Sequence, residues 1–159
     1  MFRKMRRFKQ QLNEDEVTRI LQTATSGALS VIDEDGYPYA VPLSFVYLDG
    51  KIYFHSAKTG HKIDAVKNCD KATFCIIDKD DVQPEKYTTF YRSVIAFGKV
   101  KIVEEADEAM LAINALGERY YPDHNKELQA EIEKFKSAFS IIKFDIEHIT
   151  GKQAVELTD

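Results

Sequence analysis

Two Asp-Gly pairs, each lying between extended apolar runs, constrain the fold of this chain more than any other feature. Asp35-Gly36 and Asp49-Gly50 are typical of two-residue β-hairpin turns, because these residue types tolerate the positive φ angles that such turns require. Strands joined by so short a turn run antiparallel. A doubly wound parallel sheet needs a crossover helix between strands, and the first three expected strands have none. We therefore expect an antiparallel sheet.

Hydrophobic periodicity indicates the remaining elements. Apolar residues at helical spacing predict helices at 14–23, 61–68, 104–121 and 126–136. Apolar runs with strand character predict strands at 28–32, 37–48, 51–56, 72–77, 89–103 and 139–146, and polar residues predict a loop at 78–88. The strand at 89–103 exceeds the usual length, so we expect it to bend at Gly98, as barrel strands do. The pattern predicts a mainly β fold, a closed or nearly closed antiparallel barrel with peripheral helices.

The length and composition favour one domain. The chain has 159 residues, of which 44% are hydrophobic and 30% charged, and no apolar run approaches the ~18 residues of a membrane-spanning helix. We take residues 1–159 as a single domain, with a basic N-terminal arm at 1–12 and a helical insertion at 104–136 before the last strand. The basic start has no apolar signal core behind it, so we expect a cytoplasmic protein without a membrane partner.

The charge distribution bears on the partners. Residues 1–10 carry five basic side chains and no acidic one, and because the net charge of the chain is -4, the rest of it carries -9. So acidic a body argues against nucleic acid as a partner. The arm is compatible with a solvated terminus, or with contact to an anion or an acidic neighbour.

Common cofactor and metal motifs are missing from the sequence. Cys69 and Cys75 lie six positions apart, and the four histidines form no helical pair, so we expect no metal site. The chain has no Gly-x-Gly-x-x-Gly, no Gly-x-Ser-x-Gly, no Walker-type phosphate loop and no His-Glu-x-x-His. We therefore expect no Rossmann-type dinucleotide site.

One segment has the composition of a phosphate site. It follows a predicted strand, opens a predicted helix and combines hydroxyls, lysines, imidazoles and a glycine: His55, Ser56, Ala57, Lys58, Thr59, Gly60, His61 and Lys62. The first amides of a helix lack intrahelical partners and carry partial positive charge, which favours a phosphate. Lysine adds a point charge, and a hydroxyl adds a hydrogen bond. A capped turn with solvent-facing lysines would have the same composition.

Two other segments carry features that a ligand could use. Pro42 cannot donate to a strand ladder, so the main-chain groups around it could bind a flat heteroaromatic ring, although an edge strand also tolerates proline. This segment comprises Val41, Pro42, Leu43 and Ser44. In the other segment, which ends at Val94, Tyr91 and Ser93 share one face of a strand and Arg92 opposes them. A buried arginine needs a partner, so Arg92 should lie at an edge, an interface or a ligand.

Seven segments, taken in order, carry a resemblance to a known family. They are Met5–Arg7, Asp35–Tyr39, Val41–Tyr47, Gly50–Ala57, Gly60–Lys62, Tyr91–Lys99 and Ile149–Lys152. With them the chain resembles the pyridoxamine 5'-phosphate oxidase-like FMN-binding split-barrel flavoproteins, and most of all their nitroimidazole-resistance (Nim-type) branch. The similarity extends over nearly the whole chain, and the ordered set is specific where no single motif is.

The resemblance implies a six-stranded antiparallel Greek-key split barrel that binds FMN, as a homodimer with two flavins at the subunit interface. It implies that residues 41–44 lie along the isoalloxazine ring and that residues 55–57 hold the ribityl and phosphate region. It also implies that His61 and Lys62 bind the phosphate and that residues 91–94 come from the other subunit. The cofactor-binding residues so implied are Val41, Pro42, Leu43, Ser44, His55, Ser56, Ala57, Gly60, His61, Lys62, Tyr91, Arg92, Ser93 and Val94.

The same resemblance implies a flavin-dependent oxidoreductase that reduces small molecules such as nitroaromatics, with NAD(P)H as an electron donor. His55 and His61 are candidate proton donors, because histidine titrates near neutral pH. The oxidase that gives the family its name holds pyridoxamine phosphate with a basic C-terminal segment, whereas residues 151–159 contain one basic residue, Lys152. Pyridoxamine 5'-phosphate oxidase-like activity therefore stays an alternative, as does a non-catalytic flavin- or haem-binding protein.

Overall fold

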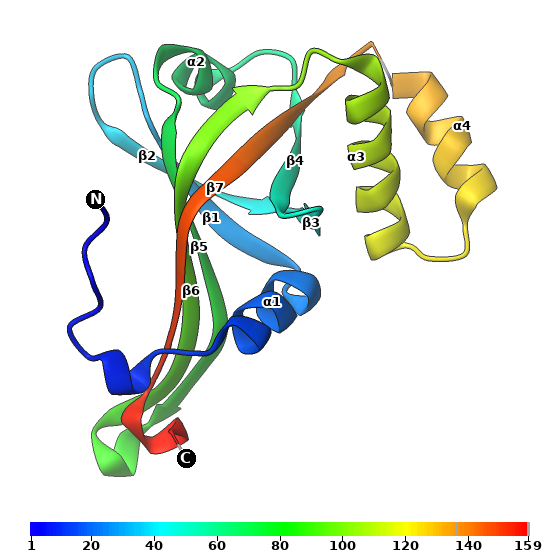
Figure 1. Ribbon diagram of the computed structural model, residues 1–159. Coiled ribbons are helices and arrows are strands. Elements are labelled where there is room, and N and C mark those ends of the chain that lie inside the picture. Colours follow the sequence, from blue (N-terminus) through cyan, green and yellow to red (C-terminus); the bar gives the residue numbers. More distant parts are fainter. Residues whose placement is uncertain (136, 159) are drawn as a thin grey trace.

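The computed structural model describes residues 1–135 and 137–158, without the side chain of Phe135 (Figure 1). In this part of the chain one sheet contains the strands β1 (Ser26–Ile32), β2 (Pro38–Ser44), β3 (Val46–Leu48), β4 (Lys51–Ala57), β5 (Lys71–Gln83), β6 (Thr88–Ile102) and β7 (Phe139–Gln153). The α-helices are α1 (Glu14–Thr23), α2 (His61–Asn68), α3 (Ala106–Tyr120) and α4 (Asn125–Phe135), and short 3-10 helices lie at Phe8–Gln10, Pro84–Lys86 and Val155–Leu157. None of these helices has the length and apolar character needed to cross a membrane.

The strand order forces the sheet to curl. The order is β2-β1-β5-β6-β7-β4-β3, and every neighbouring pair is antiparallel. β2 and β3 lie at opposite edges of the sheet, yet only Phe45 separates them in the chain. The two edges must therefore approach each other, and the sheet curls into a half-barrel whose core contains Phe45 (Figure 1). The expectation of a mainly antiparallel β fold with peripheral helices is confirmed.

The sheet has seven strands in the described residues, rather than the six that the resemblance implies. The predicted run 37–48 divides at Phe45, because the residues before it pair with β1 and the residues after it pair with β4. One straight strand cannot reach two partners at opposite edges of a sheet. Pro42 lies in β2, which is an edge strand and tolerates the missing backbone donor, as predicted.

Two strands are longer than the sequence predicts. β5 continues past Ile77 to Gln83 and pairs there with β6, so the loop predicted at 78–88 was wrong except for the turn at residues 84–87. A two-stranded ribbon exposed on both faces accepts polar residues as readily as a loop does, which explains the error. β7 continues from Ile146 to Gln153, because β6 offers it backbone partners over the whole distance.

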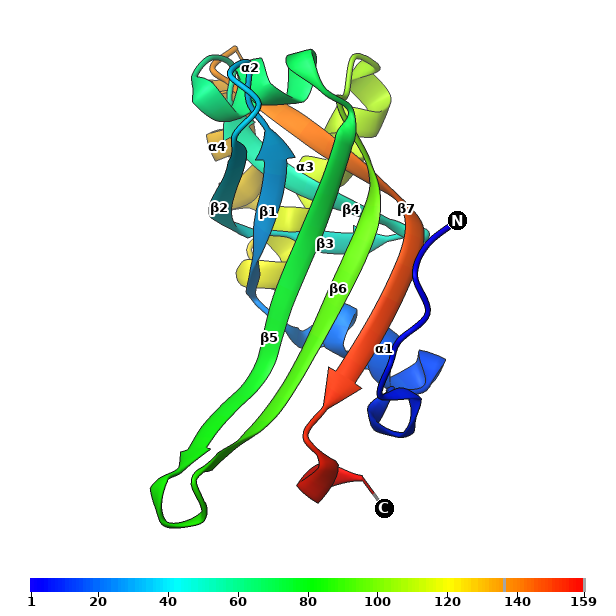
Figure 2. The ribbon, with the colours of Figure 1, turned by 90° about the vertical axis from the view of Figure 1, so that its left-hand side faces the viewer.

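Gly98 interrupts the regular pairing of the long strand β6, close to where the sequence predicts a bend. The register between β6 and β7 shifts between Phe97 and Gly98. A Cβ atom on Gly98 would overlap the carbonyl oxygen of Asp145, so only glycine allows these two backbones to approach so closely. Figure 2 shows β6 and β7 curving along their length.

The helices agree with the predicted positions. α1 has the predicted bounds, and the side chain of Asn13 caps it by accepting a hydrogen bond from Glu16 N at 2.8 Å. α3 begins at Ala106, two residues after the predicted start, and α4 begins at Asn125, one residue before it. The predicted last residue of α4, Lys136, lies outside the described residues.

Apolar side chains pack on both faces of the sheet. On the concave face, Phe74 meets Phe45 and Phe54 edge to face, with ring centroids 5.0 Å apart in each pair, and α1 and α2 cover this core. A smaller cluster lies on the other face of β4 and β7, beneath α3: Val46, Tyr53, Ala112, Leu116 and Ile141. β4 is thus packed from both sides at Ile52, Tyr53 and Phe54.

Candidate functional site

The end of β4 and the start of α2 form a polar corner, residues 55–62, which we name the β4–α2 corner. Ser56 points into the protein and is 5% exposed, while His55 points outward. Gly60 precedes α2 with a φ of 123°, a conformation that favours glycine. Because Gly60 has no side chain to cap α2, the first amides of the helix are open to an external acceptor.

Two basic side chains of the β4–α2 corner influence each other. Burial lowers the pKa of His55 below its ordinary value, and the positive charge of Lys62 lowers it further. Burial also lowers the pKa of Lys62. No carboxylate of the described residues offsets either shift. A bound anion would raise both pKa values, because it favours the charged forms.

His61 is oriented by two residues that the sequence did not place in the site. Its Nε2 lies 3.3 Å from Asp33 Oδ2, and its ring stacks on that of Tyr39 with centroids 4.2 Å apart. The other carboxylate oxygen of Asp33 accepts hydrogen bonds from the amides of Asp35 and Tyr37 in the turn before β2. The Asp-Gly pattern predicts a turn here, but the connection between β1 and β2 spans residues 33–37 and is longer than the two-residue turn predicted. No local signal reports a contact with a residue 28 positions away.

β2 runs beside the β4–α2 corner at the edge of the sheet. The side chains of Val41 and Leu43 pack against the core, whereas Pro42 and Ser44 are exposed on the other face. A ligand on the exposed face would therefore meet Pro42, Ser44 and the main chain of β2. The stack of Tyr39 on His61 joins the start of this strand to the corner. Tyr39 lies on the face of β2 that carries Val41 and Leu43, opposite to Pro42 and Ser44.

The third predicted segment, residues 91–94, lies elsewhere in the same chain. β1 and β5 separate β2 from β6, which places roughly 14 Å between those two strands. Val94 points into the core and is 1% exposed. Tyr91 and Ser93 lie on the opposite face of β6, because side chains alternate along a strand. The structure therefore brings His61 to the start of β2, while residues 91–94 of the same chain lie apart from β2.

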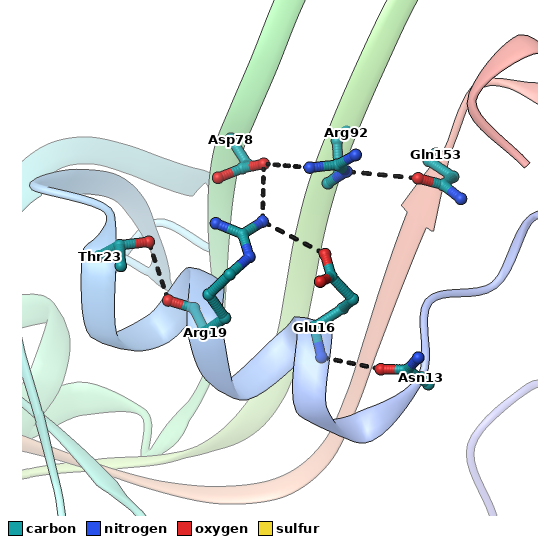
Figure 3. A network of polar contacts seen from close by, with 7 residues as sticks. All are labelled: Asn13, Glu16, Arg19, Thr23, Asp78, Arg92 and Gln153. Atoms are coloured by element: carbon teal, nitrogen blue, oxygen red, sulfur yellow. Dashed lines mark hydrogen bonds and ion pairs between the residues drawn. The ribbon is translucent and has the colours of Figure 1, made fainter.

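Arg92 has its partners within its own chain (Figure 3). Its Nη1 donates to Asp78 Oδ2 and its Nε donates to Gln153 Oε1, both at 3.3 Å, and Arg19 of α1 donates to the same Asp78 oxygen at 3.4 Å. The sequence predicts that Arg92 lies at an edge, an interface or a ligand, whereas β6 is an interior strand and Asp78 and Gln153 of the same chain are the partners of Arg92. The guanidinium turns toward α1, on the face of β6 that is opposite to Ser93.

A hollow of the surface borders the β4–α2 corner at Lys58. It has a volume of about 750 Å³ and lies between α2, the end of β6 and the start of α3, where it is lined by Lys58, Val66, Val100, Lys101, Glu104 and Glu108 among others. None of the residues expected to contact a cofactor lines it. Within residues 1–135 and 137–158, no three His, Cys, Asp or Glu side chains are grouped so that they could hold a metal ion.

Comparison with known proteins agrees with the architecture. The model of a family described as pyridoxamine 5'-phosphate oxidase matches residues 13–153. No curated protein sequence matches the chain.

Three solved structures share the fold. A conserved hypothetical protein from Mycobacterium tuberculosis has a TM-score of 0.83 at 18% identity, over 97% of this chain and 92% of that one. The FAD and haem binding protein from Mycobacterium smegmatis has a TM-score of 0.79 at 20% identity, over 94% and 76%. A candidate 5-nitroimidazole antibiotic resistance protein from Bacteroides thetaiotaomicron has a TM-score of 0.74 at 20% identity, over 90% and 86%. At these identities the likeness establishes the fold alone.

Proposed function

The chain belongs to the pyridoxamine 5'-phosphate oxidase family, and from this premise we propose that it binds FMN and uses it to reduce small molecules such as nitroaromatic compounds. We place it in the nitroimidazole-resistance (Nim-type) branch. Similarity to a candidate nitroimidazole resistance protein and to an FAD and haem binding protein supports a flavin and a nitro substrate. In this proposal residues 1–159 are one FMN-binding split-barrel domain of Greek-key type, with an arm at 1–12 and an insertion at 104–136.

The observation that carries the proposal is the start of α2 at the β4–α2 corner, which has no side-chain cap and follows the buried hydroxyl of Ser56 in the same segment as Lys62. A phosphate there would accept hydrogen bonds from the first amides of α2 and from Ser56, and it would raise the pKa values of His55 and Lys62 by favouring their charged forms. The main chain at 41–44 would then lie along the ring system. When bound, FMN supplies the two-electron chemistry, and the protein supplies binding and orientation.

The position of residues 91–94 supports a homodimer with the flavin at the subunit interface. Tyr91 and Ser93 lie too far from β2 to join the site of their own chain, but a second copy could present them. Large apolar side chains are exposed on the same outer face of the sheet, namely Ile77 at 69%, Ile95 at 41% and Phe97 at 37%. An apolar face of this kind is typical of a protein interface.

His55 and His61 are the proposed proton donors to the substrate, with NAD(P)H as the external source of hydride. Asp33 and Tyr39 hold the ring of His61 in one orientation. If His55→Ala and His61→Ala each leave turnover unchanged while flavin stays bound, neither residue has this role.

The phosphate role is tested with FMN and riboflavin, which differ only in the phosphate. Purified protein should be yellow and release FMN on denaturation. In a fluorescence-quenching titration, the variant Ser56→Ala/Lys62→Ala should lower the affinity for FMN at least tenfold and the affinity for riboflavin much less. Thr23→Ala/Lys67→Ala, which removes the same kinds of group elsewhere, is the control. Equal losses for both ligands would remove the proposed phosphate site.

A second candidate is a flavin- or haem-binding protein without catalysis of its own, which the likeness to an FAD and haem binding protein favours. Reduction of a nitroaromatic by NAD(P)H, with one NAD(P)H consumed for each nitro group taken to nitroso, separates the two. Oxidation of pyridoxamine 5'-phosphate is the third candidate. It is the least supported, because Lys152 is the one basic residue near the C-terminus.

A further inference from the structure

The hairpin of β5 and β6 extends beyond the rest of the sheet as a two-stranded ribbon (Figure 2). The last residue of β6 that pairs with β7 is Arg92, whereas the pairing with β5 continues to Thr88. About 13 Å of ribbon therefore has no third strand beside it. A two-stranded hairpin is marginally stable on its own in water, so this ribbon gains if another surface covers it.

The base of the ribbon is fixed in direction (Figure 3). Asp78 lies at a register shift of β5, and its Oδ2 accepts hydrogen bonds from Arg92 on β6 and from Arg19 on α1. Arg92 in turn donates to Gln153 at the end of β7. These contacts tie both strands to α1 and β7, so the ribbon projects from a rigid base.

The tip of the ribbon presents an aromatic side chain that touches little of its own chain. Tyr87 is 98% exposed, and its φ of 51° lies in the left-handed region, which an aromatic residue rarely adopts. Val82 beside it is 61% exposed. Exposed tyrosines on rigid supports are typical anchors of protein interfaces. Glu85 lies at the tip and Asp80 nearer the base, opposite Tyr91, and residues 79–87 carry three acidic side chains against two lysines.

A notch on the N-terminal arm has the complementary character. It has a volume of about 390 Å³ and is lined by Arg6, Arg7, Phe8, Lys9, Gln10 and Val155. Its apolar parts, Phe8 and Val155, are 69% and 60% exposed. Gln10 is only 6% exposed, and its Oε1 has no hydrogen-bond partner among the described residues. A buried amide oxygen without a donor is costly and points to a missing partner.

We propose that the tip of the ribbon docks into this notch on a second copy of the chain. Tyr87 of one copy fills the notch between Phe8 and Val155 of the other, and its hydroxyl donates to the buried Oε1 of Gln10. Asp80 and Glu85 face the arginines of the arm. This inference rests on the proposed function only in taking the second copy to be the subunit that completes the flavin site.

Charge reversal in two separate variants tests the pairing. Asp80→Lys/Glu85→Lys reverses the charge of these two positions on the ribbon, and Arg6→Glu/Arg7→Glu reverses the charge of two positions on the arm. Each variant alone should raise the dimer dissociation constant at least tenfold in sedimentation equilibrium. An equimolar mixture of the two should associate as the original chain does, because every contact in the mixed dimer joins opposite charges. Weak association in the mixture, or unchanged association of either variant alone, overturns the proposal.

The aromatic anchor is tested by substitutions that spare the backbone. Tyr87→Asn keeps a residue that tolerates the left-handed conformation and should weaken the dimer at least tenfold, while Tyr121→Asn, at another exposed tyrosine, should not. Tyr87→Phe should weaken the dimer less, and in a Gln10→Leu chain it should have no effect. An unchanged dimer dissociation constant in all Tyr87 variants would overturn the proposed ribbon contact but would not bear on the flavin site. A monomeric original chain that binds FMN would instead overturn the shared interface.

Discussion

His55 and Lys62 illustrate how single residues of the β4–α2 corner acquire a function from their surroundings. Burial makes the charged form of each less favourable, and their mutual repulsion adds to this for His55. A histidine whose pKa is depressed in the folded protein binds protons more weakly there than in the unfolded chain. Its stabilising effect is therefore complete above pH 6.5 and is lost as the pH falls toward the lowered value.

A phosphate ligand should reverse this behaviour and take up a proton on binding. We expect the FMN affinity of the original chain, divided by that of His55→Gln, to rise up to about tenfold between pH 8 and pH 6, because one unit of pKa corresponds to a factor of ten. The ratio removes the titration of the phosphate itself, which is common to both proteins. Riboflavin provides the control and should give a constant ratio. A flat ratio for FMN would show that His55 does not face the phosphate.

Residues of the candidate site were predictable to the extent that their signal is local. The serine, the lysines and the imidazoles of residues 55–62 follow one another in the chain, so composition is enough to raise an anion site as a prediction, although a capped turn has the same composition. Asp33 and Tyr39 act on His61 through contacts that only the folded sheet creates. For Arg92, the cost of burying a guanidinium predicts that a partner exists but does not identify Asp78.

Helix α3 is docked on the sheet by a buried ionic contact. Lys143 of β7 is 8% exposed, and its Nζ donates to Glu108 Oε1 at 2.7 Å, while the hydroxyl of Tyr53 donates to the same oxygen at 2.8 Å. The hydrogen bond from Lys143 lowers the pKa of Glu108 below its ordinary 4.5. Burial and the bond to Glu108 raise the pKa of Tyr53. These contacts hold the predicted insertion against β4 from the side opposite to the core.

Removal of the charge on Glu108 should weaken this attachment. Glu108→Gln should lower the free energy of unfolding by about 2 kcal/mol at pH 7, because it leaves the buried ammonium of Lys143 without a carboxylate. The deficit should shrink below pH 4.5, as the original carboxylate is lost through its depressed pKa. Urea unfolding at several pH values measures the loss of stability at pH 7 and its decrease at low pH, with Glu104→Gln as the control. An equal stability of the two proteins at pH 7 would contradict the docking role.

Whole elements were predicted well where one periodicity governs a segment. The bounds of α1 follow from an apolar stripe and an N-cap, and both are local. The division of the 37–48 run and the extension of β5 depend on which strands lie alongside. The residues of these two segments do not show which distant strands those are. Phe45 is apolar like its neighbours, and only the closing of the sheet makes it the bend between β2 and β3.

In the proposed dimer, a second copy of the chain completes the half-barrel. The exposed apolar face of β5 and β6, the distance of residues 91–94 from β2 and the uncovered ribbon all lie on surfaces that a partner could bury. A flavin held between two copies is linked to their association, so each stabilises the other.

Dilution should therefore release the flavin. With FMN at a fixed concentration, lowering the protein concentration through the dimer dissociation constant should reduce the fraction of protein that holds flavin, measured by recovery of flavin fluorescence. The midpoint should follow the dimer dissociation constant measured by sedimentation. A bound fraction that depends on free FMN alone, at every protein concentration, would indicate a site contained in one chain.

A crystal structure determined with excess FMN tests directly whether the β4–α2 corner and a partner subunit hold the cofactor together. The account predicts the phosphate within hydrogen-bond distance of the first amides of α2, with Ser56, His55 and Lys62 around it, and Ser93 of the partner subunit against the same cofactor. Ordered FMN at another place on the surface, or enclosed by a single chain at the β4–α2 corner, would contradict it.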